Sequence, residues 1–213
     1  MPVIEIRHPL VKHKIGLLRE DPISTKKFRE LTAEIGRLLA YEACKDFPLE
    51  RTMVQGWNGP VEIEQIKGKK VTLVPILRAG LGMLDGMMRL LPTAEVGFLG
   101  MIRDEETLIV STYADRVPHD LSGRQVYVLD PMLATGGTLV DAIDLLLQRG
   151  ATDVTAICLL AAPEGLQRLR DAYDERDVSV QVVTAGCDER LNEKGYIVPG
   201  LGDAGDRLYG VVG

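Results

Sequence analysis

Aromatic residues are scarce in this chain of 213 residues, and basic residues do not outnumber acidic ones. Phe, Trp and Tyr make up 5% of the sequence, too little for the aromatic platforms on which single-stranded nucleic acids stack. The net charge of −6 also lacks the basic excess that nucleic-acid binders use against phosphate. We therefore expect no nucleic-acid partner, although a locally positive cleft could still hold a small anion.

The sequence also has few cysteines and no long apolar run. The three cysteines, Cys44, Cys158 and Cys187, are odd in number and widely spaced, which argues against a disulfide framework or a zinc site. No apolar stretch approaches the roughly 20 residues of a membrane helix. The first ten residues hold no apolar core of a secretion signal. We expect a cytoplasmic protein without a membrane partner.

What the sequence does contain is an alternation of apolar and amphipathic segments after residue 70. Apolar runs at 71–77, 95–102, 126–129, 154–160 and 178–183 predict strands, most of them buried on both faces. Segments 81–91 and 138–149, and a third that begins at Pro163, predict helices between them. This alternation predicts an α/β fold with a parallel sheet and helices on both of its faces.

The rest of the chain fits around this core as a single domain, 1–213. Helices are predicted over 9–19 and after a cap at Ser24, whereas 44–70 is turn-rich and 103–118 suggests a hairpin or excursion. We expect N-terminal helices within 1–70, the core at about 71–185, and a separate C-terminal segment from about 186 to 213.

The loop after the predicted strand 126–129 is the most informative segment. It leads into an amphipathic helix and reads Asp130, Pro131, Met132, Leu133, Ala134, Thr135, Gly136, Gly137, Thr138. Free N–H groups and the dipole of a helix N-terminus favour an anion, and the glycines let the backbone approach phosphate oxygens. The threonine hydroxyls can donate to phosphate, and Asp130 can accept from ribose hydroxyls. The alternative is that Thr138 only caps the helix and the glycines only form the turn.

A second loop follows the predicted strand 71–77. Arg78 stands at the end of that strand, where its guanidinium could bind a diphosphate bidentately or could simply be solvated. Gly80 and Gly82 begin a dinucleotide-binding pattern, but the match fails because its sixth position is Asp85.

The C-terminal run 195–210 is rich in glycine. It also satisfies the dinucleotide pattern formally, yet too little chain follows to build the required helix and strand. We expect a loop whose backbone approaches a ligand closely, the alternative being a tail packed on the surface.

Together these three segments resemble the uracil branch of the type I phosphoribosyltransferases. Asp130 and the run 134–138 are similar to the family's signature for 5-phosphoribosyl-1-diphosphate (PRPP), and Asp130-Pro131 matches the uracil branch, where many other members have two acidic residues. A second carboxylate therefore cannot be assumed to hold the ribose or a metal. The stretch 74–82 resembles the pyrophosphate loop of the family, and 195–210 resembles its uracil-binding hood.

The resemblance implies transfer of the phosphoribosyl group of PRPP to N1 of uracil, giving UMP and diphosphate. It implies PRPP contacts from a set of residues in three loops: Arg78, Arg103, Asp130, Pro131, Met132, Leu133, Ala134, Thr135, Gly136, Gly137, Thr138 and Asp203. Uracil would be read, largely by backbone groups, at Ile197, Gly202, Asp203 and Ala204. The catalytic residues would be Arg78, Arg103 and Asp203. Asp203 could orient PRPP or a metal-bound water, or assist removal of the N1 proton.

The resemblance also implies partners and movements. These are Mg²⁺ held mainly by PRPP and water, a flexible loop after Arg103, a homo-oligomer (dimer or tetramer), and, in some members, activation by GTP. Three rival functions share the fold: transfer to a purine, RNA-binding regulation of pyrimidine genes, and nucleotide sensing without catalysis. The C-terminal hood argues against the first and the acidic net charge against the second. The third is opposed by the presence of Arg78, Arg103, Asp130 and Asp203.

Overall fold

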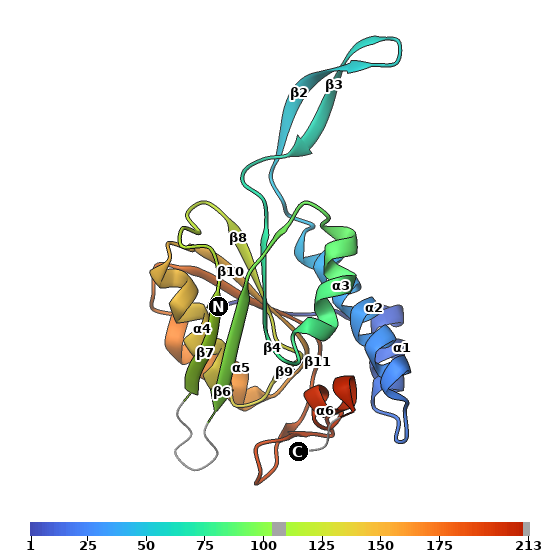
Figure 1. Cartoon of the computed structure of the whole chain (residues 1–213), viewed down its shortest axis with the longest axis vertical. Coiled ribbons are helices and arrows are strands. Elements are labelled where there is room, and N and C mark those ends of the chain that lie inside the picture. The colour runs from blue at the N-terminus through green and yellow to red at the C-terminus, as the bar shows by residue number, and fades with distance from the viewer. Residues whose placement is uncertain (104–109, 211–213) are drawn as a thin grey trace.

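The computed structural model describes residues 1–103 and 110–210. Its centre is a sheet with the strand order β1-β11-β10-β8-β4-β6-β7 (Figure 1). The strands are β1 (Val3–Glu5), β11 (Ser179–Cys187), β10 (Asp153–Ala161), β8 (Gln125–Leu129), β4 (Thr72–Leu77), β6 (Phe98–Arg103) and β7 (Val110–Arg116). Neighbours along this order are parallel, except that β7 runs antiparallel to β6. Two short strands extend the sheet: β5 (Glu95–Val96) beside β4, and β9 (Met132–Leu133) beside β10.

Helices cover both faces of this sheet, as the sequence predicts. On one face lie α1 (Pro9–Leu18), α2 (Thr25–Ala43) and α3 (Leu81–Leu90), and on the other α4 (Gly137–Gln148) and α5 (Pro163–Tyr173) (Figure 1). Along β8, Tyr127 and Leu129 pack into the core under α1–α3, whereas Val126 and Val128 pack under α4 and α5. Burial on both faces is why such strands read as continuous apolar runs.

The predicted helix boundaries are confirmed at three positions. Ser24 caps α2, its hydroxyl accepting from the Lys27 N–H at 3.2 Å. Pro163 is the first residue of α5. Gly150, with φ of 85°, follows the end of α4 in the left-handed region that stops a helix.

The segment 44–70 differs from the expected turn-rich connection. It forms a hairpin of β2 (Leu49–Gly56) and β3 (Gly59–Ile66) that projects from the body as an arm (Figure 1). The description of 1–70 as helical is also incomplete because β1 belongs to the central sheet. The strands of the arm escaped prediction since most of their side chains are exposed, so neither strand has the continuous apolar run of a strand in the central sheet.

The C-terminal segment holds a small hairpin, β12 (Arg190–Leu191) and β13 (Ile197–Val198), and a short helix α6 (Ala204–Tyr209). A loop throughout 195–210 is therefore the wrong expectation for its last part. The carboxylate of Asp203 caps α6 by accepting from the Asp206 N–H at 2.9 Å. That cap begins a helix in a segment whose glycine content predicts none.

Among the described residues, no helix has both the length and the apolar character needed to cross a bilayer.

Candidate active site

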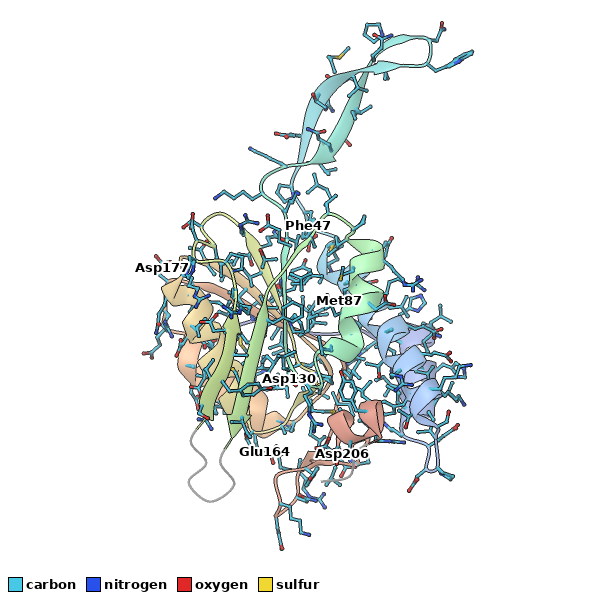
Figure 2. The ribbon with its side chains drawn as sticks, viewed as in Figure 1. Phe47, Met87, Asp130, Glu164, Asp177 and Asp206 are labelled. Carbon is cyan, nitrogen blue, oxygen red and sulfur yellow. The ribbon has the colours of Figure 1, made fainter. Side chains whose placement is uncertain are left out.

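The predicted ligand-binding residues gather at the carboxyl edge of the sheet. Arg78 follows β4, Arg103 ends β6 and Asp130 follows β8, and these three neighbouring strands run parallel. Figure 2 shows Asp130 at the end of the sheet that faces α6, with Glu164 and Asp206 nearby, and Phe47 at the opposite end. The carboxyl edge is where open parallel sheets bind ligands.

The β8–α4 loop ends at the N-terminus of α4, where both the backbone conformation and the close packing require glycine. Gly136 is the N-cap of α4 with φ of 78°, and a Cβ at this position would lie 2.9 Å from the carbonyl oxygen of Gly165. Thr138 lies inside the first turn and is not the N-cap. The alternative that Thr138 merely caps the helix is therefore wrong, and the N–H groups of this turn keep the arrangement that attracts anions.

The same loop encloses a hollow of about 150 Å³. It is lined by Asp130, Met132, Leu133, Ala134, Thr135, Gly136, Thr138 and Leu139. The loop is also braced from behind, because a Cβ on Gly165 of α5 would lie 2.3 Å from the Ala134 carbonyl oxygen. Close backbone contact with α5 thus fixes the shape of the hollow.

Asp130 is the titratable group of this hollow. Its Oδ1 accepts from the Met132 N–H at 3.3 Å. Burial raises the pKa of the carboxyl group to about 6, while the Met132 hydrogen bond opposes the rise. Within residues 1–103 and 110–210 this carboxylate has few partners, so it retains acceptor capacity for a ligand, as binding of ribose hydroxyls would require.

The β4–α3 loop lies directly against the end of β8. A Cβ on Gly80 would lie 2.3 Å from the Leu129 carbonyl oxygen, so only glycine permits this approach. The preceding Arg78 has an exposed side chain, and its peptide bond to Leu77 is cis. Its carbonyl accepts from the Tyr209 hydroxyl at 3.0 Å. The loop therefore contacts both β8 and α6.

The C-terminal segment approaches both loops. A Cβ on Gly205 would lie 3.2 Å from Oδ1 of Asp203 and 4.0 Å from Nη2 of Arg78, so both charged groups lie close to Gly205. A Cβ on Gly195 would lie 3.9 Å from Cγ2 of Thr135. Three segments that are far apart in the sequence thus meet at one edge.

The residues predicted to read uracil differ in exposure. Ile197 and Ala204 are buried in the C-terminal segment. Gly202 and Asp203 are exposed, and Gly202 has φ of 79°.

Arg103 is placed only by its backbone, which pairs with Val110 across β6 and β7. The segment predicted to form the flexible loop, 104–109, lies outside the described residues.

A network of arginines fixes the C-terminal segment to the α1–α2 connection. Arg19 binds the carboxylate of Asp188 at 2.6 and 2.8 Å and donates to the Gly200 carbonyl at 2.7 Å. Arg207 donates to the Leu18 carbonyl at 2.8 Å and lies 4.8 Å from the centre of the Phe28 ring. Sequence reasoning missed these residues, because each partner is more than a hundred residues away and no local motif marks the pair.

The acidic side chains at this edge indicate how a metal ion could be bound. Within residues 1–103 and 110–210, no group of three or more His, Cys, Asp or Glu side chains is gathered to hold a metal ion. Mg²⁺ commonly binds through one or two carboxylates together with substrate phosphates. Asp130 and Asp203 are carboxylates of that kind, so the residues fit Mg²⁺ that is held largely by a phosphorylated ligand.

Comparisons with known proteins agree along nearly the whole chain. The family model for uracil phosphoribosyltransferase matches residues 5–211. A uracil phosphoribosyltransferase from Nocardioides sp. (strain ATCC BAA-499 / JS614) is 64% identical over 208 residues, with 98% of each chain covered. A solved protein from Aquifex aeolicus is 45% identical, with a TM-score of 0.92 and 98% of each chain covered.

A more distant similarity concerns the fold alone. A hypoxanthine-guanine phosphoribosyltransferase from Bacillus anthracis, at 16% identity, superposes with a TM-score of 0.51 over 81% of this chain and 83% of its own.

Proposed function

The chain belongs to the uracil phosphoribosyltransferase family, and from that premise we propose which of its residues carry out each part of the reaction. It transfers the 5-phosphoribosyl group of PRPP to N1 of uracil, which gives UMP and diphosphate. The observation that carries our assignment of roles is the meeting of three segments at one edge of the sheet: the β4–α3 loop, the β8–α4 loop and the C-terminal segment.

The β8–α4 loop holds the 5-phosphate and the ribose. The N–H groups at the start of α4 donate to phosphate oxygens, with the hydroxyls of Thr135 and Thr138 beside them. Asp130 accepts from the ribose hydroxyls. Support comes from the left-handed Gly136, which begins the helix without a side-chain capping hydrogen bond, and from the hollow that these residues line.

Arg78 and Arg103 act on the diphosphate. As the bond between C1 of the ribose and the diphosphate oxygen breaks, negative charge grows on the leaving group, and nearby guanidinium groups stabilise it. When bound with PRPP, Mg²⁺ would supply further positive charge at the diphosphate, with Asp130 and Asp203 as the carboxylates able to contact it or its waters. The exposed Arg78 beside the C-terminal segment supports this assignment.

The C-terminal segment reads the base. Uracil presents an acceptor, a donor and an acceptor at O2, N3–H and O4, and backbone groups of Ile197, Gly202 and Ala204 can match that order. N1 then bonds to C1 of the ribose and its proton leaves. Asp203 either orients PRPP or a metal-bound water, or accepts that proton. Its position near Gly205, close to which Arg78 also lies, supports a role next to PRPP.

We also propose that the chain acts as a homo-oligomer. The β2–β3 arm carries exposed apolar side chains along its length: Leu49, Met53, Trp57, Val61, Ile63 and Ile66. A single two-stranded hairpin is only marginally stable in water, so packing against another copy would stabilise the arm. Activation by GTP and a cytoplasmic location are further parts of this proposal. The first rests on the family, and the second on the three cysteines, which form no disulfide.

The test is UMP formation from labelled uracil, PRPP and Mg²⁺, beside reactions with cytosine, hypoxanthine and guanine. We expect product from uracil alone. Arg78→Ala should lower kcat/KM by about a hundredfold or more, with no change in melting temperature, because its side chain is exposed. Product from a purine would overturn the role of the C-terminal segment. Failure with every base, by folded protein that binds PRPP, would indicate a nucleotide sensor.

A further inference from the structure

Arg168 of α5 lies over the start of α4. A Cβ on Gly137 would be 3.3 Å from Nη1, 3.4 Å from Cζ and 3.5 Å from Nη2 of Arg168. Because these three distances are nearly equal, the flat face of the guanidinium is turned toward the position of that Cβ. Gly137 is the first residue of α4, so the absence of a side chain there allows a full positive charge to approach the helix N-terminus.

The base of Arg168 is held in place by tight packing. Its neighbour Leu169 is fully buried, and a Cβ on Gly136 would lie 3.1 Å from Cδ1 of Leu169. The backbone contact between Gly165 and Ala134 fixes the same helix to the β8–α4 loop one turn earlier. The first turn of α5 and the phosphate loop therefore form one packed unit, and Arg168 extends from that unit toward α4.

Within the described part of the chain, no close ion pair neutralises the charge of the Arg168 guanidinium. Among the described residues, none of the ion pairs shorter than 4.0 Å involves Arg168. The charge of Arg168 acts on the carboxyl group of Asp141, which lies one turn after Gly137. The pKa of Asp141 is raised by partial burial, while the charge of Arg168 opposes the rise and that of Asp144 adds to it.

We propose that Arg168 is an additional phosphate-binding residue, whose charge joins the N-terminus of α4 in attracting the 5-phosphate of PRPP and of UMP. This inference rests on the proposed function, since it takes the β8–α4 loop as the 5-phosphate site. A phosphate monoester carries a charge of about −1.5 to −2 at neutral pH, whereas a helix N-terminus supplies only about +0.5. A guanidinium beside that terminus supplies the missing positive charge and further N–H donors.

The test compares Arg168→Gln with Arg37→Gln. Arg37 is an exposed arginine of α2, on the other face of the sheet, so this control removes the same charge far from α4. We expect Arg168→Gln to raise the KM for PRPP and the calorimetric Kd of UMP by about three- to tenfold with kcat unchanged. Inhibition by inorganic pyrophosphate, which lacks the 5-phosphate, should not change. Arg37→Gln should behave as wild type.

Three further measurements separate charge from structure. The effect of Arg168→Gln should shrink as salt increases, because the group is exposed and screened, and Arg168→Lys should restore much of the affinity. Asp141→Asn should act in the opposite direction and tighten UMP binding, because it removes a negative charge next to Arg168.

The outcomes that overturn the proposal are equally definite. Unchanged binding of UMP and PRPP by Arg168→Gln would exclude the role. Equal weakening of UMP and pyrophosphate, independent of salt and not rescued by lysine, would assign Arg168 to structure alone. Failure of the proposed function would look different, because the wild-type protein would then form no UMP from uracil and PRPP.

Discussion

At the scale of single residues, Asp130 shows how burial sets the chemistry of the site. The pKa of this carboxyl group is raised to about 6, so the folded protein prefers the protonated acid more strongly than the unfolded chain does. The stabilisation that follows is present below the unfolded pKa of about 4 and is lost as pH rises through about 6. At neutral pH the protein therefore keeps a carboxylate that weakens its own fold, which is typical of a group retained for binding.

Asp130→Asn should reveal this cost directly. The amide keeps an oxygen that accepts from the Met132 N–H but cannot ionise, so the free energy of unfolding should rise by about 1–3 kcal/mol at about pH 8. At about pH 4 it should change little. Urea unfolding of both proteins at the two pH values measures the difference. An equal change at both values would contradict the assigned cause.

At the scale of elements, the start of α6 combines an observed structural role and a proposed catalytic role in Asp203. Its carboxylate caps a helix of six residues, and that helix also contributes Tyr209, which donates to the Arg78 carbonyl. The C-terminal segment is held from the other side by Arg19 and Arg207. Loss of the cap would thus loosen the contact between the C-terminal segment and the β4–α3 loop.

Replacing Asp203 by alanine and by serine separates the two requirements. Serine keeps an oxygen that can cap α6, so Asp203→Ala should lower stability by about 1 kcal/mol relative to Asp203→Ser. Both variants lose the carboxylate, and both should lower kcat for UMP formation by about a hundredfold. Thermal unfolding and initial rates measure the two effects. Wild-type turnover by the serine variant would show that the reaction does not use the carboxylate.

At the scale of the whole molecule, the arm of β2 and β3 stands apart from the body. Its two ends meet where the Lys67 N–H donates to the Pro48 carbonyl at 2.8 Å. The exposed apolar residues of the arm, Trp57 at its tip among them, are spread along both strands. The body, by contrast, buries its apolar residues in two cores on either side of the sheet.

Replacing residues 49–66 by a short glycine linker should leave the body folded and abolish self-association. The cores on both faces of the sheet contain no residue from the arm, so the melting temperature of the monomer should change little. Sedimentation or light scattering of both proteins at one concentration measures the assembly. An arm-less chain with the same oligomeric mass as wild type would show that another surface holds the copies together.

The sequence by itself determined the alternating architecture and the position of the glycine-rich β8–α4 loop. The strands read clearly because burial on both faces demands continuous apolar runs, as Val126, Tyr127 and Val128 illustrate. The loop from Asp130 to Thr138 can be recognised because the residues that we propose to bind phosphate are contiguous in sequence and lead directly into the start of α4.

Only the tertiary structure decided which distant groups meet. Arg168 reaches Gly137 because two helices pack side by side, and Arg19 meets Asp188 because the C-terminal segment folds back onto the α1–α2 connection. The arm and α6 also escaped prediction, since an exposed hairpin needs no clear apolar face and a single capping carboxylate begins so short a helix. Contacts between residues far apart in the chain depend on packing geometry, and no local pattern of residues records it.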